Sequence, residues 1–138
     1  MDVVPHNDLS LDAARRLVQQ VVGAAAAESV ALTVAVVDSA GTLIAFERMD
    51  GAPRFSAQLA AAKARTAATF GNPTSELEAT FRDRAVFANS FASQGAWYFG
   101  RGGFPVRVEG ELVGGIGVSG EKAEREEELA RRAAVSLA

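Results

Sequence analysis

The chain has 138 residues, a net charge of −3 and an apolar content of 49%, and it contains no cysteine. Length and composition predict one globular domain over residues 1–138, able to bury roughly two thirds of the surface that its unfolded chain exposes. The weak negative charge argues against nucleic acid or an anionic membrane as a partner, and the absence of cysteine excludes disulfides, thiolate metal sites and cysteine nucleophiles.

The N-terminus and the apolar runs predict a cytoplasmic protein. Asp2 and His6 lie in an N-terminal segment without the apolar stretch of a secretory signal. The longest nearly apolar run, Val21 to Ala27, is far too short to cross a bilayer. We therefore expect no membrane partner.

The first part of the chain predicts a helix followed by a β-hairpin. Ser10 is expected to cap a helix that ends near Glu28, because apolar residues recur at helical spacing between them. The segment from Leu32 to Met49 is apolar at nearly every position on both sides of a polar turn. This pattern predicts a hairpin whose two faces are both covered.

A second helix is expected from about Phe55 to Phe70, because Gly71 and Pro73 follow it. Its larger residues share one stripe at about 100° per residue: Phe55, Leu59, Thr66 and Phe70. Lys63 lies at the edge of this stripe, and alanines occupy the opposite side. We expect one side to pack on the sheet and the other on a second element, such as another subunit.

A third helix is expected after Pro73, continuing with a break to Phe91. Thr74 or Ser75 would cap it, and Ser75 with Glu78 fits a capping box. Residues 96–99 predict a short strand.

The last third of the chain predicts a second hairpin and a final helix. The hairpin would pair residues 105–108 with residues 111–118 across a tight turn at 109–110, and the helix would run from about Glu121 to Leu137. Because hairpins form antiparallel sheets, the element order predicts an α+β domain.

The segment from Gly115 to Gly120 matches G-x-G-x-x-G after a strand and before a helix. A dinucleotide fold needs a further parallel strand and an acidic residue about 20 residues on, and the chain ends before that. Glu121 and Glu124 would also repel a phosphate at this helix start. We therefore interpret the glycines as positions of close backbone packing.

Two titratable residues are candidates for chemistry. His6 is the only histidine, so sites built on several histidines and a Ser–His–Asp triad are excluded; it is either a solvated side chain or a single axial haem ligand. We predict no metal-ion site. Lys63 would either pair with Asp50 or Glu47, or serve a site as an anion-binding cation or a reactive amine.

Seven of the ten aromatic residues fall in one stretch: Phe81, Phe87, Phe91, Trp97, Tyr98, Phe99 and Phe104. One interpretation is a core beneath the third helix. The other is a pocket for a flat apolar ligand, with Arg101 and the backbone amides of Gly102 and Gly103 binding its carboxylates.

Five motifs in order carry a resemblance to a known family: Ala35-Val36-Val37-Asp38 with Gly41, Phe46-x-Arg48-Met49-Asp50-Gly51-Ala52, Lys63-Ala64-Arg65-Thr66-Ala67, Gly102-Gly103-Phe104-Pro105, and Gly114 to Gly120. They resemble the GlcG/HbpS family, also called the haem-degrading or DUF336 domain, which forms the C-terminal domain of PduO-type proteins. The resemblance covers nearly the whole chain.

The resemblance implies a five-stranded antiparallel sheet flanked by helices, with profilin-like topology. It also implies a homo-oligomer, as a dimer or a larger assembly, and a possible haem-binding role. At the start of the last helix, where the family usually carries glycine and then aspartate, this chain has Glu121 and Glu126.

The resemblance also implies site residues. The family's lysine, arginine and aspartate map to Lys63, Arg48 and Asp50, and its glycine loop maps to Gly102 and Gly103.

Two hypotheses of function follow. In the first, the protein binds haem or a similar flat carboxylated ligand at a cleft near a subunit interface. Haem degradation is a further option under this hypothesis. The expected cofactor-binding residues are His6, Arg101, Gly102, Gly103 and Phe104. In the second, the protein is a small enzyme that acts on an anionic metabolite, with Lys63, Arg48 and Asp50 as catalytic residues. A third option is an oligomeric accessory protein without chemistry.

Overall fold

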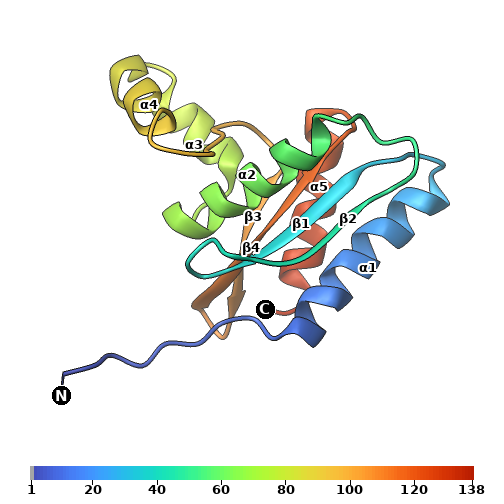
Figure 1. The fold of residues 1–138 in the computed structure, drawn as a ribbon, viewed down its shortest axis with the longest axis horizontal. Helices are drawn as coiled ribbons and strands as arrows, with labels where there is room; N and C mark the ends of the chain where they lie inside the picture. The colour runs from blue at the N-terminus through green and yellow to red at the C-terminus, as the bar shows by residue number, and fades with distance from the viewer. Residues whose placement is uncertain (1) are drawn as a thin grey trace.

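Four antiparallel strands form one sheet with helices on both faces (Figure 1). The computed structural model describes residues 2–138. The strands are β1 (Thr33–Asp38), β2 (Leu43–Arg48), β3 (Gly103–Val108) and β4 (Glu111–Ser119), in the order β2-β1-β4-β3. The helices are α1 (Leu11–Ala27), α2 (Ser56–Phe70), α3 (Thr74–Phe81), α4 (Ala85–Ala92) and α5 (Ala123–Val135). The α+β class with an antiparallel sheet is therefore confirmed.

The prediction of a fifth strand is wrong, because residues 96–99 form a loop. The backbone N–H of Tyr98 donates to Thr66 Oγ1 on α2, at 3.0 Å, and not to a neighbouring strand. The profilin-like topology stays a prediction.

The two faces of the sheet are covered differently. On one face, α1 and α5 pack on alternate residues of the central strands, including Val34, Val36, Ile116 and Val118. On the other face, α2 packs on Ala35 and Val37. The core therefore lies mainly between the sheet and the α1/α5 layer.

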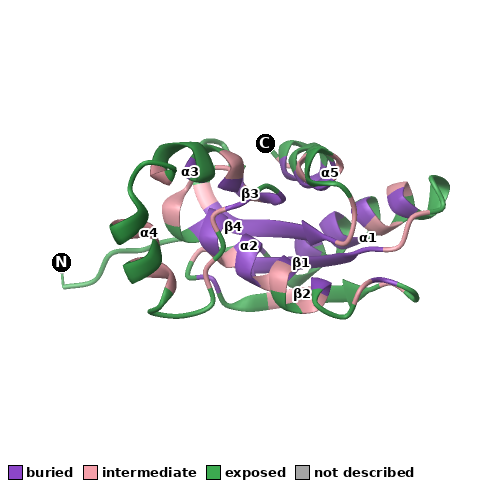
Figure 2. Cartoon of the chain, turned by 90° about the horizontal axis from the view of Figure 1, so that it is seen from above, coloured by how far each residue is buried: buried purple, intermediate pink, exposed green. Residues whose placement is uncertain are grey.

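The expectation that both hairpin strands are covered on both faces holds for β1 and is wrong for β2. All but the last residue of β1 are buried, whereas β2 is exposed or half-buried along its length (Figure 2). β2 is an edge strand, and α2 does not extend over it. As a result Leu43 and Phe46 keep 52% and 38% of their surface exposed.

The small side of α2, and not its stripe of larger residues, meets the sheet. Ala60, Ala64 and Ala68 are buried there against β1 and β4. A Cβ at Gly117 would lie 2.6 Å from Ala64 N and closer still to Ala60 O, so only glycine admits this approach. The packing interpretation of the G-x-G-x-x-G segment is thereby confirmed.

The predicted helix boundaries are largely confirmed. Ser10 Oγ accepts the backbone N–H of Ala13, and Gly71 ends α2 in the left-handed conformation with a φ of 71°. The predicted break in the third helix separates α3 from α4. The capping box of Ser75 and Glu78 is wrong, because the Ser75 hydroxyl bonds to the Glu127 carboxylate on α5.

Candidate functional site

Lys63 lies in the interior, where α2, β4 and α5 meet. Its side chain is 3% exposed. Its ammonium donates to Glu126 Oε1 at 3.0 Å and to the carbonyl oxygen of Val118 at 3.1 Å. Acceptors on two sides suit the protonated amine, which has donors only.

Glu126 is held as firmly as its partner. Its second oxygen, Oε2, accepts the backbone N–H of Gly120 at 2.8 Å and of Glu121 at 3.2 Å. The carboxylate therefore accepts hydrogen bonds from backbone amides ahead of α5 and also forms the ion pair with Lys63. These contacts make the pair a structural connection between α2, β4 and α5.

The predicted partners of Lys63, Asp50 and Glu47, are wrong. Glu47 bonds to Gln19 on the α1 side of the sheet, and Asp50 is exposed after β2. The sequence drew attention to Glu126 only as a departure from the aspartate that the resemblance implies at the start of the last helix, and not as a partner of Lys63.

The glycine loop passes directly over the lysine. Gly102 has a φ of 118°, and a Cβ there would lie 2.9 Å from Lys63 Nζ. Both Gly102 and Gly103 are buried. The N–H of Gly103 donates to Thr74 Oγ1 at 2.9 Å, so this amide is already occupied and does not face a ligand.

Tyr98 forms the outer cover of the same region. The Lys63 ammonium lies 5.5 Å from the centroid of its ring, in a cation–π arrangement. The ring also lies against Gly100, where a Cβ would be 2.9 Å from Cζ of the ring and 3.0 Å from its oxygen. Tyr98 is 39% exposed.

The structure does not bring the three predicted catalytic residues together. Arg48 pairs in register with Thr33 at the end of the edge strand and is exposed. Asp50 is also exposed, whereas Lys63 is buried and bonded to Glu126 and Val118. The hydrogen bonds of Lys63 thus involve neither of the other two residues.

Of the predicted cofactor-binding residues, His6 is on a different segment from the other four, which are consecutive in the chain. Arg101 is on the loop over Lys63, with its guanidinium 3.6 Å from Glu124 and 3.8 Å from Glu127. Phe104 packs on the α1/α5 side of the sheet. His6 is exposed on the N-terminal arm, and its Nε2 lies 2.9 Å from Asp8 Oδ2.

The aromatic stretch forms a cluster of rings beside α3 and α4. Phe70, Phe81, Phe91 and Phe99 meet largely edge to face, with centroids 5.1–6.0 Å apart. Phe87 and Trp97 pack on Phe91. The rings are half-buried, so the interpretation of this stretch as packing is confirmed for five of its members: Phe81, Phe87, Phe91, Trp97 and Phe99. Trp97 Nε1 is buried there and has no hydrogen-bond partner within residues 2–138.

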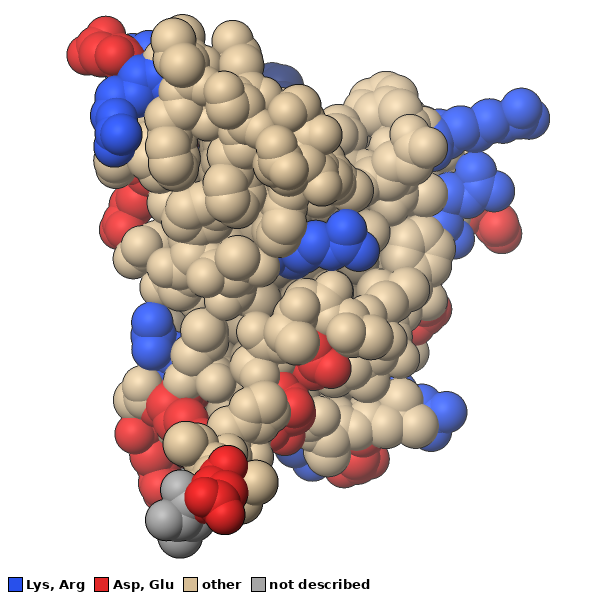
Figure 3. All heavy atoms as spheres, turned by 60° about the vertical axis from the view of Figure 1, so that its left-hand side comes forward, with Lys and Arg blue, Asp and Glu red and all other residues tan. Residues whose placement is uncertain are grey.

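Charged side chains are sparse on the side of the molecule that carries this cluster (Figure 3). Helix α4 contributes to this surface, since none of its residues is buried and Val86 is 82% exposed. Arg84 lies over the ring of Phe87, at 4.8 Å from its centroid. An apolar surface of this kind, with few charges, is typical of a surface that contacts a ligand or another protein.

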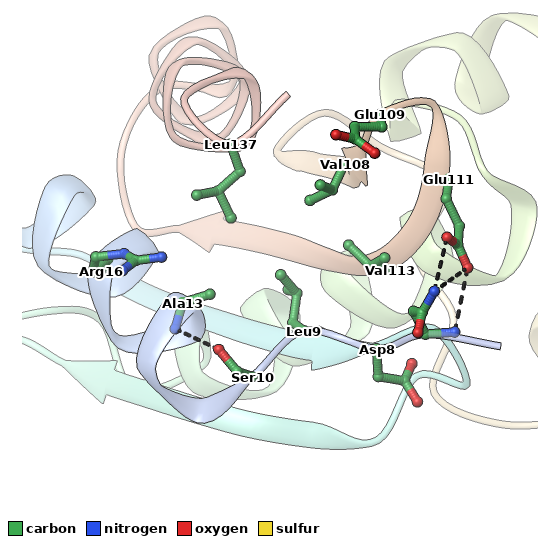
Figure 4. A pocket seen from close by; sticks show the side chains of 11 residues that line it. Asp8, Leu9, Ser10, Ala13, Arg16, Val108, Glu109, Glu111, Val113 and Leu137 are labelled. Atoms are coloured by element: carbon green, nitrogen blue, oxygen red, sulfur yellow. Dashed lines mark hydrogen bonds between the residues drawn. The ribbon is translucent and has the colours of Figure 1, made fainter.

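A separate hollow of about 460 Å³ opens at the other end of β4 (Figure 4). Leu9, Val113 and Leu137 point into it from the arm, the sheet and the chain after α5. Glu111 lies at one end, where its carboxylate accepts N–H groups of Asn7, and Arg16 lies at the other. Within residues 2–138 no three His, Asp or Glu side chains are placed to share a metal ion.

These features define a class of protein: an α+β chain with a four-stranded antiparallel sheet, an alanine-rich helix packed on glycines, and a buried lysine under a glycine loop. Residues 9–135 match the family model of haem-degrading HbpS-like proteins. The chain belongs to this HbpS-like family, which confirms the resemblance inferred from its motifs.

Individual proteins agree with this assignment. The chain is 30% identical over 126 residues to an uncharacterized 15.0 kDa protein from the dhaT-dhaS intergenic region of Citrobacter freundii, covering 91% of this chain and 89% of that protein. It is 33% identical to an HbpS double variant from Streptomyces reticuli, with a TM-score of 0.89 over 99% of this chain and 92% of that one. It is 30% identical to PduOC in its crystallised haem complex, with a TM-score of 0.84 over 94% of both chains.

Proposed function

We propose that this protein binds haem at its surface. The observation that carries the proposal is the match to PduOC, a chain crystallised with haem, along 94% of both chains. Membership of the HbpS-like family supports the same conclusion.

The residues around Tyr98 fit such a ligand best. Haem needs an apolar surface, a ligand for the iron and cations for its propionates. Phe55, just ahead of α2, is 60% exposed, and Leu59 on α2 is half-buried. Tyr98 offers a phenol oxygen, and Arg101 offers a guanidinium that is 43% exposed. When bound, the group would supply iron redox chemistry, and the residues of this chain would hold and orient it.

The alternative of an enzyme built on Lys63, Arg48 and Asp50 has no supporting contact. The ion pair with Glu126 already uses the ammonium, and Arg48 and Asp50 lie outside its hydrogen bonds. We therefore assign Lys63 a structural role beneath the proposed haem-binding surface. The homo-oligomeric assembly and the cytoplasmic location stay predictions; no helix within residues 2–138 is long and apolar enough to cross a membrane.

Titration of the purified protein with haemin tests the proposal. We expect the Soret band to shift and to saturate at a fixed ratio of haemin to chain, at micromolar concentrations. Haemin in buffer alone is the control. A spectrum that follows the buffer control at every concentration would contradict haem binding.

A further inference from the structure

We propose that Tyr98, and not His6, supplies the iron ligand in this chain. The inference rests on the proposed haem binding and names the residue that would carry it. Phenol oxygen is an established ligand for haem iron in proteins. In the bound state the Tyr98 oxygen would donate an electron pair to ferric iron, and its proton would pass to solvent.

The ring of Tyr98 is held in place by its surroundings. Its backbone N–H bonds to Thr66 Oγ1, which in turn donates to the carbonyl oxygen of Ala62 at 2.7 Å. The ring lies 5.5 Å from the Lys63 ammonium and against Gly100. These contacts restrict the ring, and the hydrogen bond of Tyr98 is made by its backbone.

The charge near the ring suits this role. The ammonium of Lys63 lies 5.5 Å from the ring centroid, and its charge is balanced by Glu126, so Arg101 is the cation of this region that is partly exposed. Arg101 is three residues further along the same loop. Its contacts with Glu124 and Glu127 are long, at 3.6 and 3.8 Å, so its guanidinium can turn to a propionate at small cost.

The surface beside Tyr98 suits a flat macrocycle. Trp97 and Phe99 flank Tyr98 in sequence, and both point into the ring cluster beside α3 and α4. Tyr98 itself points to the opposite side of the loop, towards Lys63 and α2. Leu59 on α2, one turn before Lys63, is half-buried and adds an apolar side chain.

His6 lies in a different part of the molecule. Its neighbour Asn7 bonds to Glu111 at the beginning of β4, whereas Lys63 bonds to Val118 near the end of the same strand. Seven strand residues separate these positions by roughly 23 Å. His6 Nε2 also contacts Asp8, and both side chains are exposed on the N-terminal arm.

Haemin titration of wild type, Tyr98→Phe and His6→Ala tests the assignment. Phenylalanine keeps the ring packing on Lys63 and Gly100 and removes only the oxygen, and circular dichroism will show whether each variant folds. We expect Tyr98→Phe to weaken haemin binding at least about tenfold and to abolish the phenolate-to-iron charge-transfer absorption and the phenolate bands in the resonance Raman spectrum. We expect His6→Ala to bind haemin with the spectrum of the wild type.

The other outcomes separate the two proposals. If wild type binds haemin but Tyr98→Phe keeps its affinity and spectrum, the ligand assignment is overturned while haem binding stands. Loss of binding in His6→Ala alone would assign the iron to His6 and overturn the inference as well. If wild type itself fails to bind haemin, haem binding is overturned, and the assignment to Tyr98 with it.

Discussion

Lys63 on α2 and Glu126 on α5 form an ion pair of 3.0 Å between side chains that are only 3% and 7% exposed. Two segments 63 residues apart in the chain are joined by this contact, and β4 takes part through Val118 O. A buried pair of this kind is strongly destabilising when one partner is removed, because the other charge is left unpaired.

Replacement of Lys63 by methionine should therefore lower the free energy of unfolding by about 3–5 kcal/mol. Methionine has a similar volume, so the loss would come from the unpaired Glu126 carboxylate and not from a cavity. Urea denaturation measures the change. The matched control is Arg16→Met in the exposed pair with Asp12, which should change the free energy by no more than about 0.5 kcal/mol.

The double variant Lys63→Met with Glu126→Gln sharpens this test. Glutamine keeps an oxygen for the amides of Gly120 and Glu121 but carries no charge. We expect the double variant to be more stable than Lys63→Met alone. If the two variants unfold at the same urea concentration, or Lys63→Met unfolds like wild type, the buried ion pair is not what joins α2 to α5.

Introduction of a Cβ at Gly117 should disturb the contact between α2 and the sheet. The Cβ of Gly117→Ala would lie 2.6 Å from Ala64 N, so helix and strand must separate. We expect a loss of about 1–3 kcal/mol or more, the usual range for overpacking a core. Thermal unfolding followed by circular dichroism measures it.

Gly23→Ala is the control for Gly117→Ala. Gly23 lies within α1, and no atom lies within 4 Å of the position that its Cβ would take. Alanine should stabilise this helix by about 0.5–1 kcal/mol. Equal effects at both positions would contradict the close packing of α2 on β4.

Removal of the Thr74 hydroxyl should leave an amide in the glycine loop unpaired. Thr74 is fully buried, and its Oγ1 accepts the Gly103 N–H at 2.9 Å. Thr74→Val keeps the shape and removes the acceptor, so we expect a loss of about 1–3 kcal/mol and faster hydrogen exchange at Gly103. Thr69→Val, at an exposed position of α2, is the control; unchanged exchange at Gly103 in Thr74→Val would contradict the contact.

Asp8 should make stability depend on pH in the acid range. Hydrogen bonds from the Ser39 hydroxyl and backbone N–H hold the pKa of the Asp8 carboxyl below its ordinary value of 3.8. A carboxylate with a lowered pKa contributes stability above the unfolded-state pKa and loses it as the pH falls through the folded-state value. The contribution should therefore be complete above about pH 4 and disappear below it.

Unfolding free energies measured from pH 6 downwards check this expectation. Asp8→Asn should flatten the curve below about pH 4, and Ser39→Ala, which removes one of the two donors, should have an intermediate effect. If Asp8→Asn follows the wild-type curve, the contact between the N-terminal arm and the β1–β2 turn does not contribute.

Local chemistry allowed much of the fold to be predicted. Ser10 and Gly71 mark helix ends because their preferences act within a turn of the chain. The tight turn between β3 and β4 follows from Glu109 and Gly110, which adopt φ values of 51° and 82°. Residues 96–99 have the composition of a strand but do not form one. The backbone N–H of Tyr98 donates to Thr66 Oγ1 on α2 and not to a neighbouring strand.

The candidate site was predicted only in part, since its contacts join distant segments. The sequence singled out Lys63, the glycine loop and the aromatic stretch as unusual. It did not place Glu126 beside Lys63, and the hydrogen bonds of Lys63 involve neither Arg48 nor Asp50.

Local sequence patterns predicted the helices, the two hairpins and their antiparallel pairing, because helix caps, turns and apolar periodicity act over a few residues, and the five motifs indicated the family. Packing between distant segments set which side of α2 meets the sheet, that β2 is an exposed edge, and which carboxylate pairs with Lys63. These outcomes depend on how closely two backbones can approach and on which side chains are then buried between them. Both depend on contacts between distant segments, which a local pattern of residues does not specify.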